Sequence, residues 1–155
     1  MFFNKIYKSW KKIQFEKYKF IIKDILNFVE DNSKILDLGC GPMYLEEFLK
    51  ENKIKLNLIS TDIKIPENII SLFILSNGEE LPFKNNIFDL ILSFDSTHLF
   101  NTYDIHRILK SNGMLIISLP LNISNRVEKI NGLKLIEEKE FFGMENEIFK
   151  FYSKL

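Results

Sequence analysis

The stretch from Lys34 to Leu45, which reads KILDLGCGPMYL, carries residues whose types and spacing could serve chemistry. An apolar run, Ile35–Leu38, is broken by Gly39–Gly41, and helical spacing of apolar residues begins at Met43. A strand that ends in a glycine turn and continues as a helix brings backbone N–H groups close to a ligand, with no side chain between them. The pattern therefore predicts a binding site for a nucleotide-type ligand.

Two acids narrow the class of ligand. Asp62 ends a second apolar run about twenty residues after the turn, where a carboxylate can accept the two hydroxyls of a ribose. Asp37 precedes the turn, where it would repel a pyrophosphate but would suit a cationic or zwitterionic ligand. A nicotinamide or flavin site would also need the pattern G-x-G-x-x-G, and Tyr44 stands where its last glycine should be.

The elements that would position these residues alternate along the chain. We expect helices at 5–30, 43–51, 103–109 and 122–131, and strands at 35–38, 56–62, 88–94 and 114–119. The run 69–75 fits a short helix or a strand, and two apolar stripes in the first helix allow a bend within it. Gly113 should close the helix that starts at 103. Segments 133–142 and 148–155 have only a short link, so they should form an antiparallel hairpin.

The predicted fold class is α/β, a three-layer α/β/α, Rossmann-like sheet of about seven strands with an antiparallel last strand. Residues 1–155 should form a single domain, in which 1–31 is an N-terminal helical cap. Ligands of such sheets bind at the carboxyl ends of the strands. The glycine turn, Asp62, residues 76–79 and residues 94–98 should therefore share one edge.

The composition argues against several classes of protein. The formal net charge is zero, so the total charge does not indicate nucleic-acid or membrane binding. The one cysteine excludes an internal disulfide, and no apolar run reaches the length of a membrane span. Two histidines without a third ligand make a poor metal site, so we expect no metal. The N-terminus lacks a signal-peptide core, which predicts a cytoplasmic protein.

The N-terminal helix is rich in lysine, and Glu16 is almost the only acid beside these lysines. They are Lys5, Lys8, Lys11, Lys12, Lys17, Lys19 and Lys23. They form either a solvated outer face or a basic, aromatic surface for an anionic partner such as RNA. The sequence leaves both interpretations open.

Five motifs, in order along nearly the whole chain, resemble those of the class I S-adenosylmethionine-dependent methyltransferases, in particular the small, type 11-like members. They are Asp37-x-Gly39-x-Gly41, Asp62, Asn77–Phe83, Phe88–Leu90 and Arg107–Gly113. The resemblance implies the fold named above, with its reversed last strand. It also implies transfer of the sulfonium methyl group of S-adenosylmethionine to an unidentified acceptor (EC 2.1.1 class), with S-adenosylhomocysteine as product.

The resemblance also implies how the cofactor is held. Asp37 would face its ammonium group, Gly39 and Gly41 would let the backbone approach it, and Asp62 would bind its ribose. The implied cofactor-binding residues are Asp37, Leu38, Gly39, Cys40, Gly41, Asp62, Ile63, Asn77, Gly78, Glu79 and Phe94. Met43 departs from the family pattern, because a third glycine usually stands there, and its side chain could narrow the turn.

Methyl transfer needs an aligned acceptor and the exclusion of water, and it needs a base only when the acceptor loses a proton. Asp95 and His98 follow the strand at 88–94 and are the candidate catalytic residues, although His98 fits a packing role equally well. Cytosine C5 methylation would need a nucleophilic cysteine at this edge, whereas Cys40 lies in the cofactor turn. The Pro-Pro motif of enzymes that methylate base amines is absent after residue 94.

No insertion that could form a lid precedes the final hairpin, so the acceptor site should be open. An open site favours a macromolecular acceptor, RNA or protein, over a small molecule, or a partner subunit or second copy that completes the site. Two other hypotheses remain. The chain could be a non-catalytic S-adenosylmethionine-binding subunit, or an RNA-directed methyltransferase or RNA-binding module that uses the lysine-rich helix.

Overall fold

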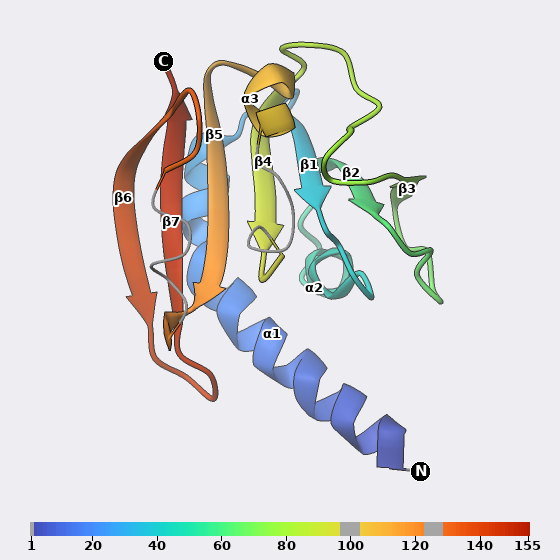
Figure 1. Cartoon of the computed structure of the whole chain (residues 1–155). Helices are drawn as coiled ribbons and strands as arrows, with labels where there is room; N and C mark the ends of the chain where they lie inside the picture. The colour runs from blue at the N-terminus through green and yellow to red at the C-terminus, as the bar shows by residue number, and fades with distance from the viewer. Residues whose placement is uncertain (1, 97–102, 123–128) are drawn as a thin grey trace.

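The computed structural model describes residues 2–96, 103–122 and 129–155, which form one seven-stranded sheet with helices on both faces (Figure 1). The helices are α1 (Phe2–Phe28), α2 (Tyr44–Glu51) and α3 (Tyr103–Ile108). The strands are β1 (Lys34–Leu38), β2 (Asn57–Asp62), β3 (Leu72–Leu75), β4 (Phe88–Phe94), β5 (Leu109–Pro120), β6 (Leu133–Phe141) and β7 (Glu147–Lys154).

The strand order is β3-β2-β1-β4-β5-β7-β6, and β7 runs antiparallel to both of its neighbours. This topology confirms the predicted fold class and the final hairpin. The chain moves outward from β1 in one direction through β2 and β3, and in the other from β4, so β1 and β4 form the switch point of the sheet. Ligand sites of open α/β sheets lie at the carboxyl ends of such strands, here toward the bottom of Figure 1.

Each face of the sheet is covered by its own apolar cluster. On one face, Ile21 and Ile25 of α1 and Phe48 of α2 pack against strand residues such as Leu90 and Phe149. On the other face, Ile105 and Ile108 of α3 pack with Ile130 against strand residues such as Leu36, Ile91 and Leu115. Central strands buried on both faces explain the almost uninterrupted apolar runs of β1 and β4.

The structure settles several of the sequence-based expectations. Helix α1 is continuous, without a break between its two apolar stripes. Gly113 does not close α3, because Leu109 already pairs with Phe88, and Gly113 lies inside β5 just after the left-handed residue Asn112. The ambiguous run 69–75 becomes a strand only at β3. The helix expected at 122–131 falls mainly outside the described residues, and 129 and 130 are not helical.

Candidate active site

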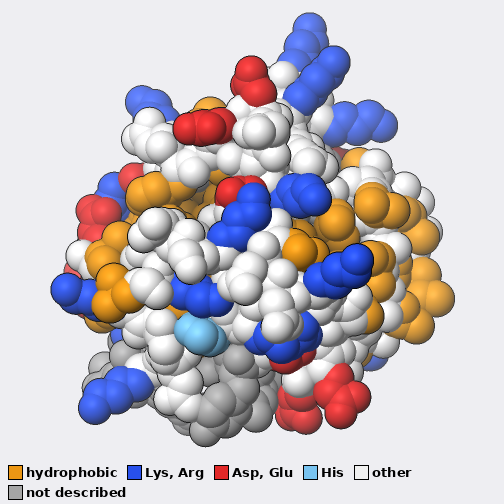
Figure 2. Space-filling view, turned by 90° about the horizontal axis from the view of Figure 1, so that it is seen from above, with side chains coloured by type: hydrophobic (Ala, Val, Ile, Leu, Met, Phe, Trp, Pro, Cys, Tyr) orange, Lys and Arg blue, Asp and Glu red, His pale blue; other side chains and the backbone are white. Residues whose placement is uncertain are grey.

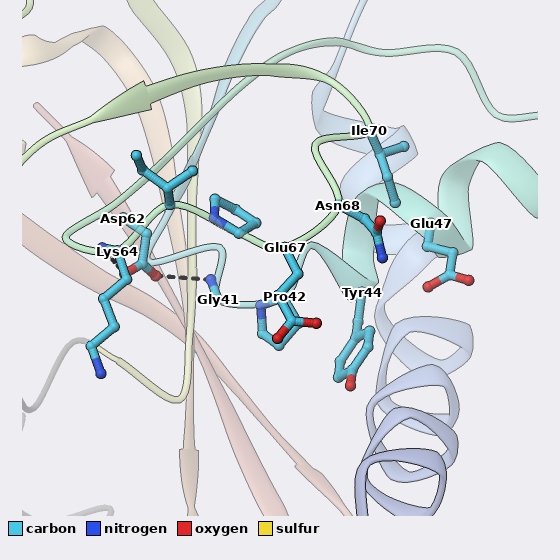
Figure 3. Close-up of a pocket in the computed structure, with 11 residues that line it drawn as sticks. Gly41, Pro42, Tyr44, Glu47, Asp62, Lys64, Glu67, Asn68 and Ile70 are labelled. Carbon is cyan, nitrogen blue, oxygen red and sulfur yellow. Dashed lines mark hydrogen bonds between the residues drawn. The ribbon is translucent and has the colours of Figure 1, made fainter. Parts of the chain in front are cut away.

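The glycine turn after β1 is fixed by hydrogen bonds to its neighbours in the sheet. The N–H groups of Gly39 and Cys40 both donate to the Thr61 carbonyl, at 2.9 and 3.0 Å. The Gly41 N–H donates to Asp62 Oδ2 at 2.8 Å, as Figure 3 shows, and the Lys64 N–H donates to Oδ1 at 3.1 Å. Each carboxylate oxygen of Asp62 keeps a further lone pair for a ligand hydroxyl.

Gly39 is also fixed from the side of β4. Its φ is +81°, and an added Cβ would lie 2.5 Å from Ser96 Oγ, so any other residue would strain the backbone and displace Ser96 or the turn. The hydroxyls of Ser93 and Ser96 both donate to the Leu38 carbonyl, at 3.0 and 3.2 Å. The end of β4 therefore holds the turn in place, and the glycine of the turn permits the backbone conformation that this requires.

Two cavities meet at this turn. The adenosine-side cavity, as we name it, has a volume of about 260 Å³ and lies between the turn and the ends of β2 and β3. The methionine-side cavity has about 190 Å³ and lies between the turn, α1 and the end of β4. Gly39 and Ser96 line both, so the two cavities adjoin and suit a ligand with two halves. A third hollow, of about 610 Å³, lies beyond Asp62 toward the start of α2 (Figure 3).

The adenosine-side cavity contains seven of the residues predicted to bind the cofactor. They are Leu38, Gly39, Asp62, Ile63, Asn77, Gly78 and Glu79. Ile63 is 67% exposed, so its side chain is free to pack on a flat ring. Asn77 Oδ1 accepts the Glu79 N–H at 3.0 Å, which orders the short turn that faces Asp62.

The methionine-side cavity contains the remaining predicted residues. They are Asp37, Cys40, Gly41 and Phe94, together with Asp95. Burial raises the pKa of Asp37 well above its usual range, and the neighbouring acids Glu46 and Asp62 raise it further. Glu46 is itself buried behind the turn, where it accepts a hydrogen bond from Ser60 Oγ at 2.6 Å. A bound cation would relieve this concentration of buried carboxyl groups.

Cys40 is unsuited to nucleophilic chemistry. Its thiol is buried, and burial, followed by the charges of Asp37 and Glu46, raises its pKa above the usual range. The thiol therefore stays protonated at neutral pH, and only the thiolate is a strong nucleophile. This agrees with the argument against cytosine C5 chemistry.

Met43 occupies the third-glycine position and keeps the backbone conformation of a glycine. Its φ is +64° and its ψ +38°, and its side chain is fully buried. The Met43 sulfur accepts the Ile70 N–H at 3.4 Å, so the side chain points under the 63–71 loop. Met43 lines neither half of the site, and it does not narrow the turn.

Helix α1 supplies site residues that the sequence did not reveal. Trp10, Gln14 and Tyr18 line the methionine-side cavity, and the side-chain nitrogen of the buried Gln14 has no hydrogen-bond partner among the described residues. Burial, followed by the charge of Asp37, raises the pKa of Tyr18 well above its usual range, so its hydroxyl stays protonated. Helical spacing shows which residues share a face, but not which cavity that face meets.

Lys17 contradicts the interpretation of the lysines as a uniformly exposed face. Its side chain is only 2% exposed, and Nζ donates to Asp95 Oδ2 at 3.1 Å, Glu147 Oε1 at 2.5 Å and Glu145 Oε2 at 3.3 Å. Burial alone would lower the pKa of Lys17, but the charge of Asp95 and the bond to Glu147 outweigh it and raise that pKa. Lys17 is therefore a cation held at the site.

The other described lysines of α1 have different surroundings. Lys11 forms an ion pair with Glu47 of α2, whereas Lys12, Lys19 and Lys23 are exposed. Figure 2 shows the face opposite the carboxyl ends of the strands, where basic side chains are interspersed with hydrophobic and uncharged ones. His98, the second catalytic candidate, lies outside the described residues.

Within the described ranges, no group of three acids, histidines or cysteines is arranged to hold a metal, and no helix could cross a membrane.

The fold and the site define a class of protein. Strand order, a reversed β7, a glycine turn after β1 and an acid at the end of β2 together form the class I methyltransferase arrangement. A family model described as a methyltransferase domain matches residues 36–117, more than half of the chain. The chain belongs to this family, which confirms the resemblance drawn from its motifs.

The chain is also similar to individual proteins, and the solved structures among them share its fold. It is 30% identical over 131 residues to the mitochondrial arginine-hydroxylase NDUFAF5 of Rattus norvegicus, covering 70% of this chain and 38% of that protein. The chain spans half or less of the length of these curated relatives, among them an uncharacterised protein of Methanocaldococcus jannaschii. The methyltransferase in a complex with the Trm112 methyltransferase activator from Haloferax volcanii aligns with TM-score 0.69, 14% identity and 94% coverage of both chains. A geranyl diphosphate methyltransferase in complex with S-adenosylmethionine aligns with TM-score 0.68, 10% identity, and 93% and 86% coverage.

Substitution of the turn glycines tests the geometry of the site. Gly39→Ala should destabilise the protein more than Gly41→Ala, because both positions have positive φ but only an alanine at 39 meets Ser96. The backbone term is about 1–2 kcal/mol for each, and the collision should add about 1–3 kcal/mol at Gly39. Urea unfolding of both variants measures the difference. Equal losses would mean that β4 does not press against the turn.

Proposed function

We propose that this chain is an S-adenosylmethionine-dependent methyltransferase that transfers the sulfonium methyl group to an acceptor. The observation that carries the proposal is the pair of adjoining cavities on either side of Gly39, with Asp62 in one and Asp37 in the other. A cofactor with a neutral nucleoside half and a cationic amino-acid half matches this division. Membership of the methyltransferase-domain family supports the same activity.

The residues of each cavity suggest how the cofactor would be held. Asp62 would accept the ribose hydroxyls, Ile63 would pack on the adenine, and residues 77–79 would offer polar groups to its edge. Asp37 would attract the ammonium group, and the Gln14 amide would donate to the carboxylate. When bound, the cofactor supplies a methyl carbon that is already activated by its sulfonium. The chain's own groups must then orient the acceptor and exclude water.

Calorimetry with S-adenosylmethionine tests this proposal. The wild-type protein should bind it and should not bind NAD. Asp62→Ala should weaken binding roughly 10- to 100-fold, because it removes hydrogen bonds made by a charged group. Asp31→Ala, in the exposed turn before β1, is the matched control and should bind like the wild type. Absence of binding to the wild type would overturn the proposal.

We further propose that Asp95, with or without His98, is the catalytic group, and that the acceptor is a macromolecule, RNA or protein. Asp95 lines the methionine-side cavity directly after β4. A shallow hollow of about 660 Å³ adjoins that cavity at Trp10 and is bounded by Pro120, Leu121 and Glu145. Its outer side offers room for a large acceptor. The alternative function, a subunit that binds the cofactor without turnover, loses its main motive because Met43 points away from the site.

Labelled methyl transfer into an extract of the host cell tests the acceptor class. Incubation with the wild-type protein should label macromolecules, and digestion with ribonuclease or protease should release that label. Incubation with Asp95→Asn should give no more label than an extract without added protein. Calorimetry of Asp95→Asn with the cofactor serves as the control for folding and binding. Label that passes a small-pore filter before any digestion would contradict a macromolecular acceptor.

We also infer that a partner subunit, rather than a second copy, covers β3. This edge strand exposes Leu72 (62%) and Leu75 (55%), and Ile63, Ile65 and Ile69 are exposed next to it. An apolar patch beside an open strand edge is typical of an interaction surface. The structurally similar Haloferax volcanii methyltransferase is in complex with an activator protein.

We also propose that the protein is cytoplasmic, in line with the free cysteine.

Charge placed on β3 tests the partner subunit. The tagged wild-type chain should recover one stoichiometric partner from its host, and that partner should bind again when both proteins are purified. Leu72→Lys with Leu75→Lys should abolish this binding and leave cofactor affinity unchanged. Leu26→Lys, at an exposed position of α1, is the control. A wild-type homodimer that the double variant converts to a monomer would identify a second copy instead.

A further inference from the structure

A buried group of three charged side chains adjoins the proposed acceptor side of the site. Lys17 comes from α1, Asp95 from the end of β4 and Glu147 from the start of β7, and Lys17 Nζ donates to both carboxyl groups. The Glu147 side chain is fully buried and that of Asp95 is 20% exposed.

The charges in this group do not balance without a proton. Two carboxylates face one ammonium group, and Glu145, the third acid near Lys17, is partly exposed and solvated. Asp95 Oδ1 and Glu147 Oε2 are both buried without a hydrogen-bond donor among the described residues. Both carboxyl groups accept from Lys17 Nζ, so they lie close together, and a proton on one of them would give the other its missing donor. A carboxylic acid paired with a carboxylate explains both unsatisfied oxygens.

We propose that Lys17, Glu147 and Asp95 form a proton-holding unit in which Asp95 accepts the proton of a protic acceptor, an amine or a hydroxyl, and Lys17 and Glu147 position Asp95. This inference rests on the proposed methyltransferase function and narrows its acceptor to groups that lose a proton. The acceptor lone pair forms the bond to the methyl carbon, the carbon–sulfur bond breaks with its electron pair going to sulfur, and the acceptor proton goes to the Asp95 carboxylate, which lines the cavity.

The surroundings of the unit suit this role. Asp95 lines the methionine-side cavity, next to the Trp10 ring that separates it from the 660 Å³ hollow. Besides its own members, Lys17 of α1, Asp95 after β4 and Glu147, the unit is faced by Tyr18 of α1 and by Glu145 in the turn before β7. Burial, followed by the charge of Asp95 and a hydrogen bond to it, raises the pKa of Glu147 to about 8, which Lys17 only partly offsets.

Stability as a function of pH tests the unit without any acceptor. A carboxyl group whose pKa is raised on folding keeps its proton in the native state, so its contribution to stability is present below pH 4.5 and is lost as pH rises toward 8. Urea unfolding of the wild type should therefore show stability falling across this window. Glu147→Gln should remove the part of that pH dependence which is due to Glu147. This part is at most a tenfold change in the unfolding equilibrium constant per pH unit. Glu145→Gln should leave it unchanged.

Direct titration and methyl transfer complete the test. Carboxyl ¹³C NMR of glutamate-labelled protein should show one glutamate signal that titrates with a midpoint near 8. That signal should be missing from the spectrum of Glu147→Gln, and its midpoint should be lower in Asp95→Asn. Glu147→Gln should shift the pH profile of methyl incorporation into extract without changing cofactor affinity, and Glu147→Asp should restore part of the profile. An ordinary Glu147 midpoint near 4.5, or an unchanged slope in Glu147→Gln, would overturn the unit. A wild-type protein that fails to bind the cofactor would instead overturn the proposed function.

Discussion

The conformation of the site depends on the close approach of Gly39 to the end of β4. Three strands meet there: β1 leads into the glycine, Thr61 of β2 accepts its N–H, and Ser96 after β4 fills the space of the missing side chain. The parallel sheet fixes these strand ends relative to one another, so a single turn can carry backbone groups to both halves of the site. A side chain at Gly39 would push the turn away from β4, and the two cavities would no longer adjoin.

Helix α1 is joined to this centre by a charge rather than by apolar contacts alone. A buried ammonium group carries a large desolvation cost, which is offset only where carboxylates surround it. Lys17 meets that condition between β4 and β7, two strands that are separated by β5 in the sheet. The helix is therefore held in one position along its axis, and Trp10, Gln14 and Tyr18 are held over the methionine-side cavity. Apolar packing through Ile21 and Ile25 would tolerate small shifts that the ion pairs do not.

Much of the fold follows from local patterns in the sequence. Apolar runs, glycine turns and the short link between the last two segments predicted most of the strands and the reversed β7, but left 69–75 open between a helix and a strand. The glycine turn and Asp62 could also be predicted from the sequence, because their spacing along the chain reflects their neighbourhood in the sheet. The contact between Lys17 and Glu147 could not be predicted, because the two residues lie far apart in sequence and only tertiary packing joins them. The continuous strand through Gly113 was missed because the pairing of Leu109 with Phe88 overrides a local helix-stop signal.

Met43 shows how this chain differs internally from a relative that has glycine at the same position. Its backbone is left-handed like a glycine's, but its thioether fills the space beneath the 63–71 loop and accepts a hydrogen bond from Ile70. The loop and the turn have thus become a single packing unit. Glycine at this position would relax the backbone and leave a void under the loop. Replacing Met43 with glycine would therefore require compensating changes near Ile70 to fill that void.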